Sequence, residues 1–308
     1  MSQSSIVVIG STNTDMVIKT TRLPQPGETI LGGTFFMNAG GKGANQAVAA
    51  ARLGGNIAFV AKTGNDVFGM KAIELFQKEG IDVSCIIKDG QHPSGVALIT
   101  VDANGENCIV VAPGANSALT AGNINDISEK INKASLVLMQ LETPIETIEH
   151  AASIAGSKGI KTILNPAPAR QLSDELLSKI SVITPNQKET EMLTGIKVSD
   201  ESSAIRASVY LREKGIQTVI ITMGATGAFV SAGELQMLIP SYKVEPVDTT
   251  AAGDVFNGAL AVALAEGKAI ETAVRFACRA AAISVTRLGA QASAPYREEV
   301  ESFETLNA

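Results

Sequence analysis

Residues 5–15 read S-I-V-V-I-G-S-T-N-T-D, an unbroken apolar run followed at once by glycine and small polar residues. Five further short apolar runs lie along the chain, at residues 58–62, 136–140, 162–164, 182–183 and 218–222. Continuous apolar character is typical of strands that are buried on both faces of a parallel sheet. Helical patterns separate these runs, at residues 44–53, 68–79, 145–154, 188–193 and 202–214. The sequence therefore predicts a doubly wound α/β fold, with a mostly parallel sheet flanked by helices.

Two stretches break this rhythm, at residues of about 16–37 and 95–111. Both alternate polar with apolar residues, and the second contains Asn104-Gly105, a pair typical of tight hairpin turns. Half-exposed strands of this kind are common in antiparallel sheets. We therefore expect a small antiparallel sheet inserted into a single domain that spans residues 1–308. It would serve as a lid over the main sheet or as the surface of a homodimer.

The composition indicates a soluble globular protein with a large core, since 45% of its 308 residues are hydrophobic and 18% are charged. A net charge of −6 without any cluster of basic residues argues against nucleic-acid binding. No apolar run approaches the roughly 20 residues that span a bilayer, and the start lacks the basic region of a signal peptide. Three widely separated cysteines favour reduced thiols. We expect a cytoplasmic protein without a membrane or nucleic-acid partner.

Polar residues follow five of the predicted strands. Ligands of open parallel sheets bind at the carboxyl ends of the strands, so these residues are candidates for a binding site. They are Asn13, Asp15, Glu142, Asn165, Asn186, Glu189 and the stretch Gly224-Ala-Thr-Gly227. A single polar residue at a strand end is most often a helix cap, whereas five successive ones favour a site.

A glycine-rich segment at residues 39–54 reads A-G-G-K-G-A-N-Q-A-V-A-A-A-R-L-G, which predicts a turn and then a helix. A P-loop would need Ser or Thr after Lys42, and a dinucleotide-binding fingerprint would need a glycine where Gln46 stands. The glycines could serve close packing alone. However, Lys42 and Asn45 lie on one side of the first helical turn, where they could donate hydrogen bonds to the hydroxyl groups of a ligand.

A second segment, residues 248–260, reads D-T-T-A-A-G-D-V-F-N-G-A-L. Its small residues lead directly into Asp254 and a helix-forming run, and the free N–H groups of a helix N-terminus favour an anion. A carboxylate in such a place suggests chemistry, in which the amides hold a phosphoryl group and Asp254 accepts a proton from the attacking group. The helix dipole is expected to lower the pKa of Asp254 slightly and keep it ionised.

These two segments resemble the two signature motifs of the PfkB family of sugar kinases. The resemblance covers nearly the whole chain, through G-S-T-N-T-D at 10–15, Q-L-E-T-P at 140–144, L-N-P-A-P-A at 164–169, T-P-N-x-x-E at 184–189 and T-x-G-x-x-G at 222–227. It implies transfer of the γ-phosphoryl group of ATP to the 5-hydroxyl of D-ribose. It also implies that Mg²⁺ is required and that a monovalent cation, usually K⁺, activates.

The resemblance further implies a role for each matched residue. Asp254 would be the general base, and the amides of Ala251, Ala252 and Gly253 would form an anion hole. The sugar would be held by Asn13, Asp15, Gly41, Lys42, Gly43, Asn45 and Glu142. The nucleotide would contact Asn186, Thr222, Gly224, Thr226, Gly227, Gly253 and Cys278, the last at a position near the adenine where the family usually has Asn or His. Glu189 would organise Mg²⁺ through water. The monovalent cation would lie among Asp248, Thr250, Ser284, Arg287, Gly289 and Ser293.

Three alternatives remain open. A kinase of the same family for deoxyribose, another pentose or a nucleoside would carry the same two segments, and only its sugar contacts would differ. A sugar-binding regulator without catalytic activity is disfavoured by the intact run at residues 251–254. A nicotinamide-dependent dehydrogenase is disfavoured because residues 39–54 fail the dinucleotide fingerprint.

Overall fold

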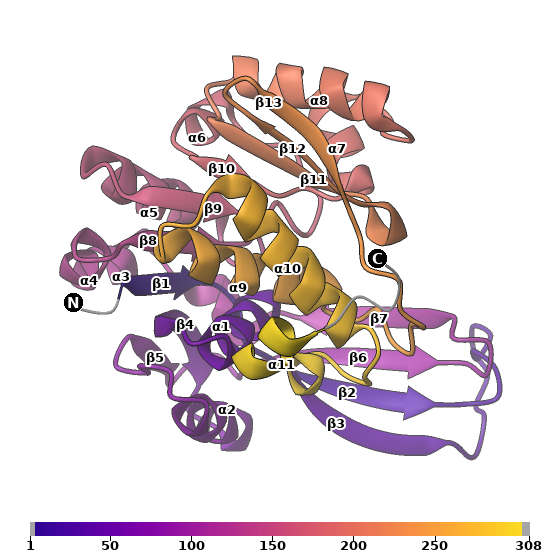
Figure 1. The fold of residues 1–308 in the computed structure, drawn as a ribbon. Coiled ribbons are helices and arrows are strands. Elements are labelled where there is room, and N and C mark those ends of the chain that lie inside the picture. Colours follow the sequence, from indigo (N-terminus) through magenta and orange to yellow (C-terminus); the bar gives the residue numbers. More distant parts are fainter. Residues whose placement is uncertain (1–3, 304–308) are drawn as a thin grey trace.

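The computed structural model describes residues 4–303, and its main sheet has nine strands in the order β13-β12-β11-β10-β9-β8-β1-β4-β5 (Figure 1). Every neighbouring pair from β11 to β5 is parallel, and only β12 and β13 at one edge are antiparallel. The strands are β1 Ser5–Ile9, β4 Asn56–Gly64, β5 Ile86–Asp89, β8 Leu136–Met139, β9 Lys161–Leu164, β10 Val182–Ile183, β11 Thr218–Thr222, β12 Gly227–Ala232 and β13 Leu235–Pro240. The predicted mostly parallel sheet is confirmed.

Helices cover both faces of this sheet and create two cores. Alternate residues of β1 point into different cores, Ile6 and Val8 into one, Val7 and Ile9 into the other. The first core contains α1 Lys42–Arg52, α2 Val67–Lys78, α9 Ala252–Ala265, α10 Ile270–Ser284 and α11 Arg297–Ser302. The second contains α3 Ala121–Asp126, α4 Ser128–Asn132, α5 Ile145–Ser157, α6 Asp174–Ser178, α7 Gln187–Thr194 and α8 Glu201–Glu213. Burial on both faces explains why the strand sequences are apolar without alternation.

Helices α1 and α9 pack closely because Gly258 has no side chain. A Cβ atom at this position would lie 2.8 Å from the carbonyl oxygen of Gln46 and 2.9 Å from the Cβ of Ala49. Both distances are shorter than van der Waals contact, so a larger residue would force the helices apart. This packing holds the two glycine-rich segments, which are 200 residues apart in the chain, against each other.

A second sheet, which we call the lid sheet, projects from one side of the molecule (Figure 1). It contains β2 Asn13–Lys19, β3 Thr34–Gly40, β6 Gly95–Val101 and β7 Asn107–Ala112, in the order β3-β2-β6-β7. The two hairpins β2–β3 and β6–β7 are antiparallel, as predicted, but the central pair β2–β6 is parallel. The reason is that both strands enter from the main sheet at the same edge, where Asn13 pairs with Gly95. The small antiparallel sheet is confirmed, and the parallel pairing of its two central strands is a detail that the sequence did not predict.

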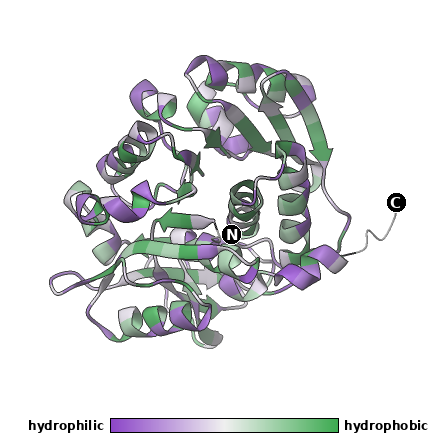
Figure 2. Ribbon diagram, turned by 60° about the vertical axis from the view of Figure 1, so that its left-hand side comes forward, coloured by the Kyte–Doolittle hydropathy of each residue, from purple (hydrophilic) through white to green (hydrophobic). Residues whose placement is uncertain are grey.

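The first lid strand begins at Asn13 rather than near residue 16, so Asn13 and Asp15 lie on the lid sheet itself. The lid strands are rich in hydrophobic residues (Figure 2). Several of them are exposed, including Phe35, Leu98 and Val110. In the described part of the chain, no helix is long and apolar enough to cross a membrane.

Candidate functional site

The first wall of the candidate site is the start of α1, which receives its cap from elsewhere in the chain. Gly41 precedes the helix with a φ of 90° and offers no side chain to the free amides. Instead, the carboxylate of Glu142, which follows β8, accepts hydrogen bonds from the Lys42 backbone N–H at 3.0 Å and from the Ser11 hydroxyl at 2.6 Å. One oxygen of Glu142 therefore fixes the loop that carries Lys42, a structural role beside the expected contact with sugar.

The opposite wall is the start of α9, where Asp254 lies in the first helical turn, as predicted. Ala251 precedes the helix with a φ of 58°, the only positive φ of a non-glycine residue in the described chain. Asp254 is only 6% exposed. Its Oδ2 accepts a hydrogen bond from Asn45 Nδ2 at 2.9 Å, and its Oδ1 accepts one from Gln46 Nε2 at 2.9 Å. The two segments that the sequence singled out thus meet at this carboxylate.

The electrostatic expectation for Asp254 was wrong in direction. Burial raises the pKa of Asp254 above its ordinary value, although the nearby Lys42 ammonium and the Asn45 and Gln46 amides oppose the rise. Desolvation penalises a charge more than the dipole of one helical turn favours it. Both carboxylate oxygens nevertheless face N–H donors, which pair with the ionised form. A carboxylate with a raised pKa is a stronger proton acceptor, as a general base requires.

Several polar groups in the region of Asp254 lack partners among the described residues. Asn45 Oδ1 is buried without a hydrogen-bond partner among the described residues. Among the described residues 4–303, none forms a hydrogen bond or ion pair with the Asp15 carboxylate. Burial, together with the charge of Glu142, raises the pKa of Asp15 to about 6, although the charge of Lys42 opposes the rise. Burial lowers the pKa of Lys42, but four surrounding carboxylates, with Asp254 first, raise it overall. Ordered water or a polar ligand would satisfy these groups.

Glycines leave room for these polar groups. A Cβ atom on Gly40 would lie 2.3 Å from an Asp15 carboxylate oxygen, and one on Gly43 would lie 2.6 Å from the Gly10 carbonyl carbon. A Cβ on Gly95 would collide with the side chain of Asn13, whose Oδ1 accepts a hydrogen bond from Asn116 Nδ2 at 2.8 Å. Asn13 is therefore partly committed to this bond, whereas the carboxylate of Asp15 is free for a ligand.

On the expected nucleotide side, Asn186 and Glu189 bind each other at the start of α7. The Asn186 backbone N–H donates to Glu189 Oε2 at 2.8 Å and its Nδ2 donates to Oε1 at 2.9 Å, while Glu189 N–H donates to Asn186 Oδ1 at 2.8 Å. Each is thus a helix cap for the other, which is the structural role that polar residues at strand ends often have. Asn186 also forms a bridge with Thr222 at the end of β11. The two expected nucleotide contacts are therefore adjacent.

The turn between β11 and β12 carries three more of the expected nucleotide residues, Gly224, Thr226 and Gly227. Gly224–Thr226 forms a single 3-10 turn, and Gly227 has a φ of 117°. A Cβ there would lie 2.0 Å from the Ile239 carbonyl oxygen, so only glycine fits. Cys278 lies buried on α10, and burial raises the pKa of its thiol to about 12, which keeps it protonated.

Asp248 joins part of the loop expected to bind a monovalent cation. Asp248 Oδ1 accepts a hydrogen bond from Thr250 N–H at 2.9 Å, and its Oδ2 accepts one from Gly289 N–H at 2.9 Å. The Arg287 side chain forms an ion pair with Glu299. The Ser284 and Ser293 hydroxyls donate to Ala281 and Ala290 carbonyls, each at 2.8 Å. Asp248 therefore fixes the loop, and a cation would depend on oxygens that these bonds leave available.

Sequence reasoning missed a set of buried amides behind Asp254. Gln46 Nε2 donates both to Asp254 and, at 3.0 Å, to Asn165 Oδ1, and Gln46 Oε1 accepts from Gln140 Nε2 at 2.6 Å. Asn165 was predicted as a strand-end candidate, whereas Gln46 entered only as a mismatch to the dinucleotide fingerprint. Its place next to Asn45, at the start of the predicted helix, is the only sequence signal that could have pointed to it.

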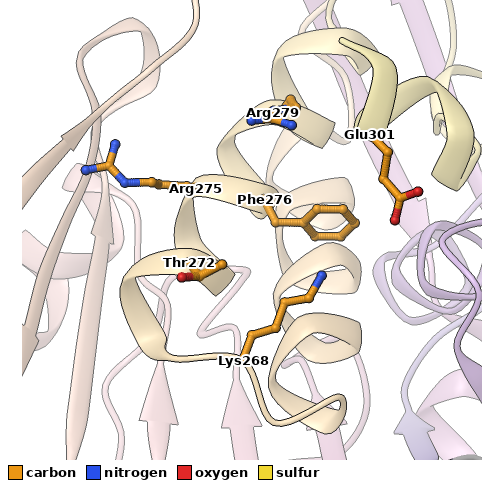
Figure 3. A pocket seen from close by; sticks show the side chains of 6 residues that line it. All are labelled: Lys268, Thr272, Arg275, Phe276, Arg279 and Glu301. Atoms are coloured by element: carbon orange, nitrogen blue, oxygen red, sulfur yellow. The ribbon is translucent and has the colours of Figure 1, made fainter.

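A separate cavity of about 310 Å³ lies along the side of α10 (Figure 3). It is lined by Lys268, Thr272, Arg275, Phe276, Arg279 and Glu301, and it contains none of the residues expected to bind sugar, nucleotide or cation. Within residues 4–303, no group of three or more His, Cys, Asp or Glu side chains could hold a metal ion.

A buried carboxylate in the first turn of a helix, beside polar groups without partners among the described residues, is the arrangement expected of a kinase that acts on a small polar molecule. More narrowly, the chain belongs to the pfkB family of carbohydrate kinases, whose sequence profile matches residues 3–297. It is 48% identical over 301 residues to ribokinase of Haemophilus influenzae, covering 98% of both chains. It is 37% identical over 303 residues to deoxyribokinase of Salmonella typhimurium, covering 98% of this chain and 99% of that one.

Comparison of the fold with solved structures also supports membership of this family. The structure of Arabidopsis thaliana ribokinase complexed with ribose and ATP superimposes with a TM-score of 0.93 at 32% identity, covering 98% of this chain and 100% of that one. The prediction of the family from the two glycine-rich segments is therefore confirmed.

Proposed function

We propose that this enzyme transfers the γ-phosphoryl group of ATP to the 5-hydroxyl of D-ribose, giving ribose 5-phosphate and ADP. The observation that carries the proposal is the buried Asp254 carboxylate, held between Asn45 and Gln46 at a helix N-terminus. The greater similarity to a ribokinase, at 48%, than to a deoxyribokinase, at 37%, favours ribose as the substrate. A solved relative that is named as a complex with ribose and ATP has the same fold.

In this reaction Asp254 accepts the proton of the attacking hydroxyl. Phosphoryl transfer depends mainly on positioning and charge stabilisation, so a carboxylate with a raised pKa suffices as the base. The amides of residues 251–253 stabilise the transferring group, since the N-terminus of a helix favours an anion. The Ala252 N–H donates to the Thr249 carbonyl oxygen at 3.3 Å, a long bond that a phosphoryl oxygen can replace.

Ribose is small, uncharged and covered with hydroxyl groups, so its recognition depends on hydrogen bonds. Asn45 Oδ1 and the Asp15 carboxylate are acceptors without protein partners among the described residues, and the Lys42 ammonium is a donor. Asp15 lies on β2, so the lid sheet would carry a sugar contact with it when it moves. Closure would then bind the sugar and exclude water in one motion.

Two cations accompany this function. Mg²⁺ bound with ATP would neutralise phosphate charge, and Glu189, whose oxygens already accept two hydrogen bonds from Asn186, would hold it through water. K⁺ would lie at the loop that Asp248 fixes to Gly289, with Thr250, Ser284 and Ser293 nearby in the chain. Arg287 would contribute through its backbone, because its side chain is paired with Glu299.

The exposed residues of the lid sheet bear on the oligomeric state. Exposed apolar residues on the lid sheet, among them Phe35, Ile109 and Val110, suit an interface between two copies of the chain. We therefore propose a homodimer of single-domain subunits joined through their lid sheets. An enzyme that consumes ATP is best placed in the cytoplasm.

A coupled ADP-release assay tests the reaction and the choice of sugar. The substrates would be ribose, deoxyribose, arabinose, fructose and adenosine, each at several concentrations. Ribose should give the highest kcat/KM. Higher kcat/KM with deoxyribose or adenosine would instead favour another kinase of the family, and no sugar-dependent ADP release would favour a non-catalytic sugar-binding protein.

A further inference from the structure

A connected set of buried amide side chains, those of Gln46, Gln140 and Asn165, lies next to Asp254. We propose that Gln46 is a positioning residue that holds the Asp254 carboxylate in the orientation and charge state needed to accept a proton. Gln140 fixes Gln46 in turn. The catalytic part of this inference rests on the proposed phosphoryl transfer, whereas the contacts themselves do not.

Every hydrogen-bonding group of the Gln46 side chain is used, and the residue is fully buried. Its two amide hydrogens go to Asp254 Oδ1 at 2.9 Å and to Asn165 Oδ1 at 3.0 Å. Its Oε1 accepts a hydrogen bond from Gln140 Nε2 at 2.6 Å. A flipped amide would place Oε1 against the carboxylate and leave Gln140 facing a donor. The network therefore allows one orientation, in which an N–H group faces Asp254.

The main sheet anchors this network. Gln140 directly follows β8 and Asn165 directly follows β9, so both partners of Gln46 sit at the carboxyl ends of neighbouring parallel strands. A Cβ on Gly10, at the end of β1, would lie 2.1 Å from Gln140 Oε1, so the site leaves Gln140 no room to move toward β1. Groups attached to rigid elements hold catalytic side chains more accurately than groups on loops.

Asn45 and Gln46 thus bind different oxygens of Asp254, Asn45 to Oδ2 and Gln46 to Oδ1. Asn45 Oδ1 has no partner among the described residues, so Asn45 is free to rearrange when a sugar hydroxyl arrives. Gln46 has no such free group. We infer that Gln46 keeps Asp254 in place while its neighbour exchanges partners.

Charged groups from three other segments face Asp254. Lys42 at the start of α1 favours the ionised carboxylate, while Glu142 after β8 and Glu189 in α7 oppose it. Burial also favours the neutral form. Together with Lys42, the amide donors of Asn45 and Gln46 oppose this effect and favour the ionised form of Asp254. Removal of the Gln46 donor should raise the pH at which Asp254 loses its proton.

Replacement of Gln46 by methionine, which has a similar shape but no donor, tests the role. We expect kcat to fall by about 10- to 150-fold, the range for one lost hydrogen bond to a charged group. At saturating sugar, the acid limb of the kcat–pH profile should shift upward by about one pH unit. The KM for sugar should change by less than about threefold, because Asp15 and Lys42 are untouched.

Thr147→Val is a matched control for the loss of a buried hydrogen bond. Thr147 is buried on α5 and donates to the Leu119 carbonyl oxygen at 2.6 Å, the one hydrogen bond that its side chain forms among the described residues. It should lower the melting temperature without moving the acid limb. A Gln46→Met variant that only loses melting temperature, with the pH profile and kcat unchanged, would overturn the inference.

Two further measurements keep the test decisive. If Gln46→Met does not fold, Gln46→Glu retains the shape and the acceptor for Gln140 but places a carboxylate against Asp254, so the acid limb should move further upward. A ¹³C NMR titration of the Asp254 carboxyl group in the free protein reports its pKa without any turnover. An unchanged pKa in the folded variants contradicts the inference even if the wild-type enzyme phosphorylates none of the sugars, which would separately refute the proposed function.

Discussion

Asp15 on the lid strand β2 should cost the unliganded protein stability in return for sugar binding. Its pKa rises from 3.8 to about 6, first because of burial and then because of the charge of Glu142. The folded state therefore binds a proton more tightly than the unfolded state does. The ionisation of Asp15 therefore has no effect on the free energy of unfolding below about pH 4. It lowers this free energy as the pH rises from about 4 to about 6, and the loss remains at higher pH. Replacement of Asp15 by asparagine removes the ionisation and with it this loss.

The magnitude follows from the pKa. A rise of about two pKa units at 1.36 kcal/mol each gives an upper limit of about 3 kcal/mol at pH 8. For a chain of this size, that corresponds to an increase in melting temperature of about 3–6 °C for Asp15→Asn. The same substitution should raise the sugar KM by about 10- to 100-fold, because an ionised hydrogen-bond acceptor is lost.

The assay is a melting curve at pH 4.5, 6 and 8, with and without sugar. Asp15→Asn should melt above the wild type at pH 8 and close to it at pH 4.5. Asp66→Asn is a control with the opposite sign. Burial of Asp66 is outweighed by hydrogen bonds from Ser94 and Gly69, which lower the pKa of this carboxyl, so its loss should destabilise at pH 8. An Asp15→Asn variant that melts no higher than the wild type at pH 8, or equally higher at every pH, would refute the reasoning.

Three further substitutions or exchanges test individual contacts. Lys42→Ala should raise the sugar KM by about 10-fold or more, since we propose that its ammonium donates to the sugar; an unchanged KM in steady-state assays would remove Lys42 from the sugar site. Gly40→Ala places a methyl group about where the Asp15 carboxylate lies, 2.3 Å away, and should also weaken sugar binding by about 10-fold in calorimetry; wild-type affinity would mean that Asp15 does not need its position. Exchange of K⁺ for choline should lower turnover, and Asp248→Ala should abolish the difference; equal activity in both salts would reject the cation site.

The sequence predicted six parallel strands of the main sheet, β1, β4, β8, β9, β10 and β11, because each contains a run of consecutive apolar residues. The run at 6–9 and most of the run at 58–62 are buried, as expected for strands that helices cover on both faces. The antiparallel edge strands β12 and β13 were not predicted; β13 is partly exposed and therefore lacks the continuous apolar run of a buried strand. The parallel pairing of β2 with β6 also escaped prediction, because it depends on where both strands leave the main sheet.

For the site, the sequence identified Asp254 and Asn45 but not the bond between them. It also predicted a lowered pKa for Asp254, because a helix N-terminus is visible in the sequence whereas burial of its carboxylate by α1 is not. Gln46 and Gln140 were missed for the same reason. Their function lies in the partners that the fold provides, and those partners are 90 to 210 residues away in the chain.

The central claim is that Asp254 accepts the proton when ATP phosphorylates the 5-hydroxyl of ribose. The most direct measurement compares single-turnover rates and ribose affinity of the wild type and Asp254→Asn, with the product identified by NMR as the 5-phosphate. The account predicts a rate about 10²- to 10⁴-fold lower in the variant, with ribose affinity within about fivefold of the wild type. A variant that phosphorylates ribose at close to the wild-type rate would contradict it.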